Sequence, residues 1–123
     1  MKMDAIEIIE YLREQNFTVK VDGDYLELSP PEKITDELIQ RLRKHKPAII
    51  AELKREERRL KVLAILADNH GIQRSFLTDT EADPDRVILT MAIRDVGTCE
   101  LLIPRHKYDP FAVLEAIEKA GIQ

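Results

Sequence analysis

The stretch FTVKVDGDYLEL, residues 17–28, constrains the fold of this chain more than any other. Apolar and polar residues alternate on both sides of Asp22-Gly23, which is the pattern of two half-buried antiparallel strands joined by a two-residue turn. A turn at Asp22-Gly23 places Val19 opposite Leu26 and Phe17 opposite Leu28. One face of the ribbon then holds these four apolar residues, and the other holds Thr18, Lys20, Tyr25 and Glu27. Because a two-stranded ribbon leaves both outer edges unpaired, we expect this one to serve another chain.

Helices are predicted on both sides of the ribbon. Asp4 followed by Glu7 is a capping box, and the apolar spacing after it predicts a helix that stops at Asn16. Thr35 is the expected N-cap of a second helix, since two acidic residues follow it in the first turn.

Pro47 should end that second helix, with Lys46 at the boundary, because an interior proline removes a backbone donor and clashes with the preceding turn. A third helix is then expected from Pro47 to a stop at Gly71. Its highly charged middle, residues 54–59, is interpreted as a solvated bridge between two units.

The second half of the chain predicts three strands and a final helix. The strands are expected at residues 74–79, 86–94 and 98–103. A loop at Asp95-Val96-Gly97 would join the last two and place Met91 opposite Leu101. Cys99 alternates with apolar neighbours and is expected to be buried. Asp109-Pro110 is the expected start of the final helix.

These elements predict an α+β fold in two units. Residues 1–54 would form an αββαα unit, and residues 55–123 a unit with a three-stranded antiparallel sheet and a final helix. The first helix of the second unit would be continuous with the preceding unit, so that one long helix joins the two.

The first half of the sequence resembles a known family. The run YLREQNFTVKVDGDYLELSPPEKITDELIQRLRKHKPAIIAEL is similar to the TubC-type N-terminal docking domain of nonribosomal peptide and polyketide synthases. The resemblance covers about residues 5–54 and rests on Gly23-Asp24, Pro31, Thr35 to Leu38, Leu42 to Lys46 and Ile49 to Leu53. Residues 60–123 are not recognised.

This resemblance implies an αββαα module, often dimeric, whose hairpin receives an extended terminal peptide of a partner protein. Such binding is strand addition, in which the free edge offers backbone hydrogen bonds and alternate side chains select the guest. Members of the family set basic hairpin residues against an acidic tail. This ribbon instead carries Asp22, Asp24 and Glu27 with one basic residue, Lys20, so a neutral or basic guest is expected.

The charge distribution leaves a second function class open. The net charge of -4 argues against a general nucleic-acid binder, yet residues 41–61 contain nine Lys or Arg and only three Glu. A basic helix can lie along a phosphate backbone, and the contact residues would be Arg41, Lys44, Arg55, Arg58 and Arg59. The other interpretation is an exposed helix stabilised by ion pairs such as Glu52 with Arg55.

The sequence gives no sign of catalysis, a cofactor or a metal. The three histidines lie far apart, and the single cysteine has no partner histidine at a recognisable spacing. The acidic stretch of residues 79–85 fails the EF-hand pattern, because Pro84 stands where glycine is needed. One cysteine excludes an internal disulfide, and neither a signal peptide nor a membrane span is visible. The expected location is the cytoplasm.

We therefore predict a non-enzymatic docking or adaptor module. It would bind an extended peptide or other protein partner at the exposed hairpin through Thr18, Lys20, Tyr25 and Glu27. The alternatives are nucleic-acid binding by residues 41–61 and a structural homodimer in which the ribbon edges of two copies pair.

Overall fold

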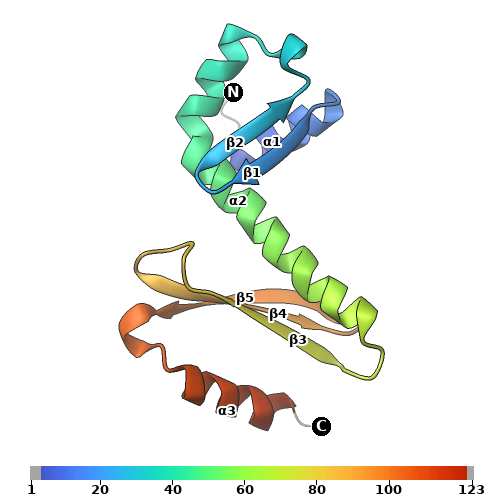
Figure 1. The fold of residues 1–123 in the computed structure, drawn as a ribbon, viewed down its shortest axis with the longest axis vertical. Helices are drawn as coiled ribbons and strands as arrows, with labels where there is room; N and C mark the ends of the chain where they lie inside the picture. Colours follow the sequence, from blue (N-terminus) through green and yellow to red (C-terminus); the bar gives the residue numbers. More distant parts are fainter. Residues whose placement is uncertain (1–3, 122–123) are drawn as a thin grey trace. The chain divides into compact units, whose positions relative to one another are not determined.

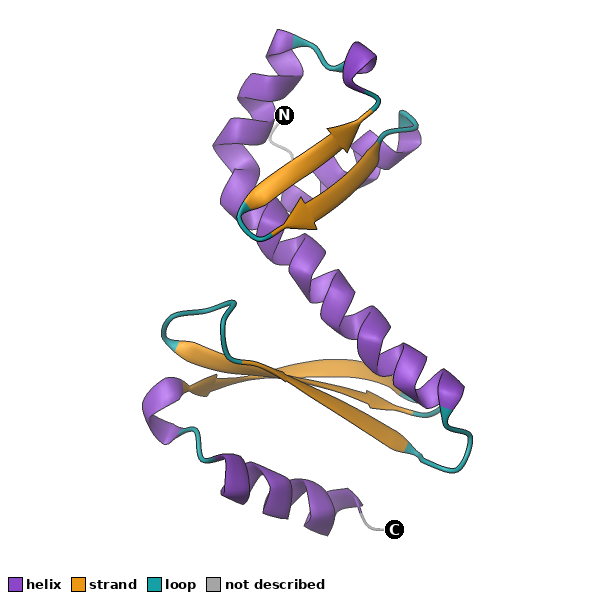
Figure 2. Cartoon of the chain, viewed as in Figure 1, coloured by secondary structure: helices purple, strands orange, loops and turns teal. Residues whose placement is uncertain are grey.

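A computed structural model describes residues 4–121, and the side chains of residues 4–115. Figures 1 and 2 show the order of the elements along the chain. They are α1 (Ala5–Glu14), β1 (Thr18–Asp22), β2 (Tyr25–Ser29), the short 3-10 helix η1 (Pro31–Lys33), α2 (Asp36–Asp68), β3 (Arg74–Asp79), β4 (Arg86–Ile93), β5 (Gly97–Pro104), the 3-10 helix η2 (Arg105–Lys107) and α3 (Pro110–Gly121). This is the predicted α+β fold. The chain divides into two compact units, Met1–Glu56 and Glu57–Gln123.

The predicted start signals of the helices are confirmed. The Asp4 carboxylate accepts a 2.8 Å hydrogen bond from the backbone N–H of Glu7, and the Thr35 hydroxyl accepts one from Leu38 at 3.2 Å. Asp109 does the same for the first turn of α3. Each of these oxygens satisfies a donor that the helix itself leaves unpaired. Asn16 has a φ of 65°, as expected of a residue that ends a helix in the left-handed region.

The predicted break at Pro47 is wrong. A single helix, α2, runs through Pro47 from Asp36 to Asp68, so the N-terminal unit is αββα with one long helix instead of αββαα. Pro47 and Arg43 are both exposed, so the carbonyl group that loses its donor lies on the solvent side, where water can replace the missing bond. The helix also ends three residues before Gly71, which was expected to stop it.

The predicted faces of the ribbon are confirmed, but its turn and register are shifted. Val19 pairs with Leu28 and Val21 with Leu26, so the two-residue turn is Gly23-Asp24. Gly23 has a φ of 61° whereas Asp24 is not in the left-handed region, which fits a turn of type II′ with glycine first. Every residue keeps its predicted face because each partner moves by two positions.

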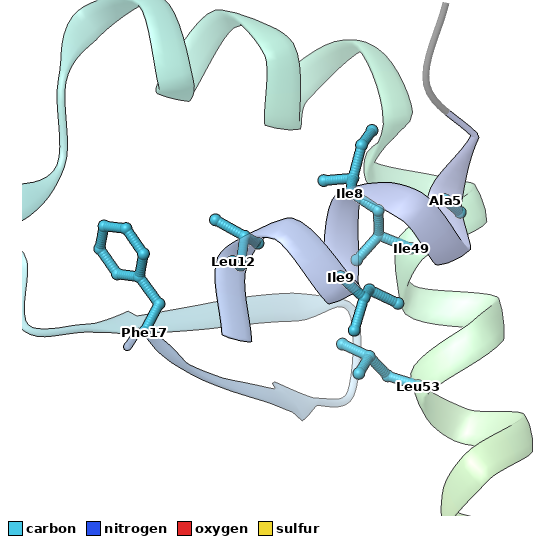
Figure 3. Close-up of a cluster of buried hydrophobic side chains, with 7 residues drawn as sticks. All are labelled: Ala5, Ile8, Ile9, Leu12, Phe17, Ile49 and Leu53. Atoms are coloured by element: carbon cyan, nitrogen blue, oxygen red, sulfur yellow. The ribbon is translucent and has the colours of Figure 1, made fainter. Parts of the chain in front are cut away.

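The core of the N-terminal unit forms between α1, the ribbon and α2. Figure 3 shows Ile8 and Ile9 of α1 close to Ile49 and Leu53 of α2, with Phe17, the residue before β1, at the other end of the cluster. The buried residues are Ala5, Ile8, Ile9, Leu12, Phe17, Ile49 and Leu53. An ion pair between Arg13 and Glu56, with Nη2 and Oε1 2.7 Å apart, also joins α1 to α2. The ribbon therefore has one face against its own helices and one face toward solvent.

The C-terminal unit contains an antiparallel sheet in the order β3–β4–β5. The loop between β4 and β5 differs from the prediction, since Ile93 pairs with Gly97 and Met91 pairs with Cys99. Asp95, with a φ of 64°, takes the left-handed position of the turn. Again the faces are unchanged because the shift is two positions.

The last part of α2 packs on one face of this sheet. Val62 and Leu66 are buried with Ala92 of β4, and Leu77 of β3 packs against them. The Ser75 hydroxyl donates a 2.6 Å hydrogen bond to the backbone carbonyl of Val62. This bond satisfies a hydroxyl that would otherwise be buried without a partner.

Candidate functional site

The solvent face of the ribbon holds the four residues that the sequence singled out. Thr18 and Lys20 of β1 and Tyr25 and Glu27 of β2 are all exposed, and 73% of Tyr25 is accessible. Lys20 lies directly opposite Glu27. Unlike charges at directly opposite positions of two paired strands attract each other. Neither outer edge of this two-stranded sheet pairs with another strand of the described chain.

A groove of about 360 Å³ runs between β2 and the first half of α2. Its lining is mostly aliphatic, with a tyrosine and two cations beside it, and no residue of β1 takes part. The lining residues are Tyr25, Leu26, Leu28, Ile34, Ile39, Leu42, Arg43 and Lys46. The groove therefore lies beside the outer edge of β2.

Tyr25 and Lys46 meet at this groove. The Lys46 Nζ lies 5.8 Å from the centre of the Tyr25 ring, within the range of a cation–π interaction. The contact links the first residue of β2 to α2 across the groove. It also explains how a tyrosine that is mostly exposed can keep a defined position.

Comparison with known protein families finds one similarity in this unit. Residues 6–55 match the model of the TubC N-terminal docking domain. The match spans α1, the ribbon and α2 as far as Arg55, and it confirms the resemblance seen in the sequence. The match suggests a protein–protein docking role for this part of the chain, and a docking role implies a protein partner. No curated protein and no solved structure matches the chain.

Part of the groove was missed by sequence reasoning. Arg43 was counted only among the basic residues of 41–61, and Lys46 was expected to be a helix boundary because Pro47 follows it. The apolar stripe of Leu38, Ile39 and Leu42 was the available signal: Leu38 and Leu42 pack against the core, and Ile39 and Leu42 line the groove.

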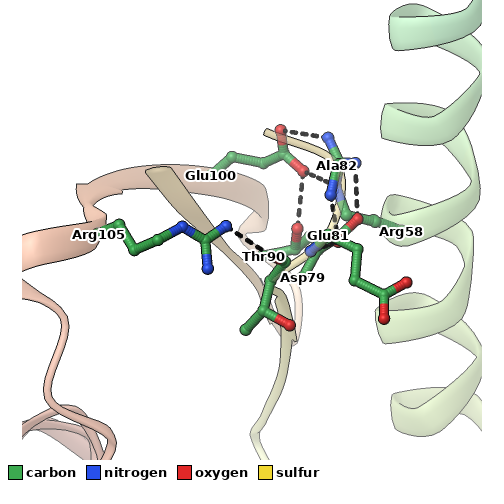
Figure 4. Close-up of polar contacts among 8 residues, drawn as sticks. Arg58, Asp79, Glu81, Ala82, Thr90, Glu100 and Arg105 are labelled. Atoms are coloured by element: carbon green, nitrogen blue, oxygen red, sulfur yellow. Dashed lines mark hydrogen bonds and ion pairs between the residues drawn. The ribbon is translucent and has the colours of Figure 1, made fainter. Parts of the chain in front are cut away.

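The C-terminal unit holds a buried cluster of charged groups around Arg58. Its Nε donates to Glu100 Oε2 at 2.8 Å, and its Nη1 donates to Asp79 Oδ2 at 3.3 Å. The Thr90 hydroxyl donates a further bond to Glu100 at 2.7 Å. Figure 4 shows these side chains converging from α2 and all three strands. Arg58 is only 7% exposed, which corrects the prediction that residues 54–59 are a solvated bridge.

The pKa values in this cluster follow from pairing. Burial alone would lower the pKa of Arg58, but the hydrogen bonds and charges of Glu100 and Asp79 raise it. Burial would likewise raise the pKa of Asp79. The backbone N–H groups of Glu81 and Ala82, together with Arg58, instead hold it below its usual value. Both groups therefore stay charged at neutral pH, and the cluster is a structural one.

Two other arginines in the C-terminal unit bind backbone carbonyl groups. Arg94 donates to the carbonyls of Leu66, Asn69 and Ile72 at the end of α2. Arg105 donates to the carbonyls of Thr80, Asp83 and Pro84 in the loop before β4. Each guanidinium uses part of its fixed fork of donors to hold the ends of a loop together.

The five basic residues of the nucleic-acid alternative do not form one exposed set. Arg58 is buried in its ion pairs, whereas the other four residues are exposed. Arg41 lies 3.7 Å from a carboxylate oxygen of Glu37 and Arg55 lies 3.9 Å from one of Glu52, as partners along the same helix.

Metal-ligand clusters, the single cysteine and the length of the helices were also compared with the predictions. No group of His, Cys, Asp and Glu there could hold a metal ion. Cys99 is exposed, so the prediction that it is a small buried hydrophobe is wrong. It lies on β5, an edge strand with a neighbouring strand on one side only. Among the described residues, none of the helices is long and apolar enough to cross a bilayer.

Proposed function

We propose that the TubC-type unit binds an extended peptide segment of a protein partner as a third strand along the outer edge of β2. The observation that supports this most is the aliphatic groove beside an edge that lacks a strand partner. A guest strand would take up the backbone donors and acceptors of β2. Alternate side chains of the guest would enter the groove.

The groove defines the chemistry of the guest. Leu26, Leu28 and Ile34 from one wall, and Ile39 and Leu42 from the other, favour aliphatic side chains. Burying one such side chain contributes about 1.5–3 kcal/mol, so two of them supply a large share of a micromolar affinity.

The basic groups at the groove change the charge expected of the guest. The ribbon alone favours a neutral or basic peptide, but Arg43 and Lys46 line the groove and can pair with a carboxylate there. We expect an acidic residue on the groove side of the guest. Neutral or basic residues are expected on its outer side, next to Glu27.

The four outward residues have different roles in this proposal. Tyr25 and Glu27 lie on β2, next to the guest strand. Thr18 and Lys20 lie one strand further away and act on the guest mainly by charge, Lys20 by offsetting part of the charge of Glu27. The domain carries out no reaction in this account, and needs no cofactor.

A labelled synthetic peptide tests the proposal. The probe alternates leucine and threonine and carries one glutamate among the groove-side positions, and a matched probe carries glutamine instead. We expect Lys46→Glu to weaken binding of the acidic probe several-fold in fluorescence anisotropy, and to change binding of the glutamine probe much less. Lys44→Glu is the control, because Lys44 is exposed on the same helix but does not line the groove.

Equal losses in Lys46→Glu and Lys44→Glu would mean that only the net charge of the domain matters, and would count against the groove. The nucleic-acid alternative is tested in the same assay with labelled duplex DNA. Tight binding that weakens steeply with salt and is lost on Arg59→Glu would favour that alternative over docking.

A further inference from the structure

The second half of α2 carries an apolar stripe that its own sheet does not cover. Leu60 is 56% exposed and Leu63 is 40% exposed, and Ala64 and Ala67 are exposed as well. These residues stand at i, i+3, i+4 and i+7, so they lie on one side of the helix. The stripe lies outside residues 6–55, the part that matches the docking domain.

The opposite side of the same helical segment is already occupied. Val62 is fully buried and Leu66 nearly so, both packed against the sheet. Arg58 lies on the same side of the helix as Val62, where it forms ion pairs with Glu100 and Asp79 of the sheet. The sheet therefore holds the helix by one side and leaves the stripe facing away from it.

We propose that this stripe is the contact between two copies of the chain, with the two helices antiparallel. Ala64 stands next to its centre and Ala67 at its C-terminal end, and these small side chains let helix axes approach closely, while Leu60 and Leu63 supply apolar area. A pairing that crosses next to Ala64 brings Ala64 of the two copies together.

The charges beside the stripe favour a second copy in this orientation. Lys61 and Asp68 are exposed and stand seven residues apart, so they line the same flank of the stripe. When two helices cross antiparallel next to Ala64, Lys61 of each copy comes opposite Asp68 of the other. The surface is thus complementary to itself, which a two-fold symmetric contact requires.

The expected contact is small. The segment from Glu57 to Asp68 is about 18 Å long at 1.5 Å per residue, so the dimer should form reversibly with concentration. This inference does not rest on the peptide-docking proposal, because the stripe and the groove lie in different units of the chain.

Sedimentation equilibrium of the full chain, over a concentration series, tests the stripe. We expect a reversible shift from the 14.2 kDa monomer toward twice that mass. Leu63→Lys should abolish the shift. Leu102→Lys is the matched control, because Leu102 is a similarly exposed leucine at 52% on β5, and it should leave the shift unchanged. Circular dichroism melting checks that both variants are folded.

A charge exchange tests the orientation. Lys61→Asp sets like charges against each other and should weaken the dimer at least several-fold, as should Asp68→Lys alone. The double variant Lys61→Asp/Asp68→Lys restores opposite charges in the antiparallel pairing and should recover most of the loss. A monomer at every concentration, a dimer unaffected by Leu63→Lys, or no recovery in the double variant would each overturn the proposal.

Discussion

Arg58 is buried because its guanidinium finds two carboxylates, one on β3 and one on β5. Pairs of this kind add little net stability when formed, since the charges must leave water. Removing one partner is different, because a buried charge is then left alone. The side chain of Glu100 is only 14% exposed, and it accepts hydrogen bonds from Arg58 and Thr90.

We therefore expect Arg58→Leu to lower the free energy of unfolding by about 3–5 kcal/mol. Adding Glu100→Leu should recover a large part of this loss, because the buried carboxylate that has lost Arg58 is removed as well. Urea unfolding followed by circular dichroism measures both changes. If Arg58→Leu costs less than about 1 kcal/mol, as is usual for an exposed pair, Arg58 is not buried as described.

The cluster also predicts a dependence of stability on pH. The pKa of Asp79 is lower in the folded chain than the usual value of about 4. The stabilisation from its charge is therefore fully present above about pH 4 and is lost as the pH falls through the lowered pKa. Asp79→Asn should be less stable than the wild type at pH 7, and the difference should shrink toward pH 2. Thermal melts across this range measure it, and a constant difference would contradict the assignment.

At the scale of elements, α2 matters most, because its first half lines the groove and its second half packs on the sheet. The helix keeps its course through Pro47 although the chain loses a hydrogen bond there. Ile49 and Leu53, just after the proline, are buried in the N-terminal core. Tertiary packing of these residues offsets the local cost.

We expect Pro47→Ala to stabilise the protein by about 1–3 kcal/mol, since alanine restores the backbone donor and removes the ring from the preceding turn. Pro47 is exposed, so little packing is lost. The measurement is the urea midpoint of unfolding. A destabilised Pro47→Ala variant would mean that the chain needs a break at this position, as the sequence alone had predicted.

Local signals predicted most of the elements and the faces of both sheets. The caps at Asp4 and Thr35, and the alternation of residues 17–28, act through neighbours in the sequence and could be read directly. The turn positions could not, because shifting a hairpin by two positions leaves its faces the same. Gly23 suits either place in the turn.

The site was only partly predictable for a similar reason. The outward face of the ribbon follows from alternation, whereas the groove arises where β2 lies beside α2 in the folded unit. Lys46 gives no sign in the sequence that it lies over the ring of Tyr25, twenty-one positions earlier. The burial of Arg58 likewise depends on Asp79 and Glu100, which come from strands far along the chain.

At the scale of the whole molecule, the chain joins a unit that matches the docking-domain model to a second unit that lies outside this match. The docking unit offers an unpaired strand edge and an aliphatic groove with basic groups beside it. The second unit offers an apolar helical stripe. In our account the first surface takes a partner protein and the second takes another copy of the chain, so a dimer would present two docking grooves and bind a divalent partner with higher avidity.

The most direct test of this account is an amide ¹H–¹⁵N NMR titration of the full chain with the unlabelled acidic probe peptide. Strand addition predicts the largest shifts and the strongest new protection from exchange along residues 25–29 of β2, with smaller shifts from Ile34 to Lys46. The amides of the C-terminal unit should not move. Shifts that centre on β1, on residues 54–61 or on the second sheet, with β2 unchanged, would contradict the claim that the edge of β2 receives the partner.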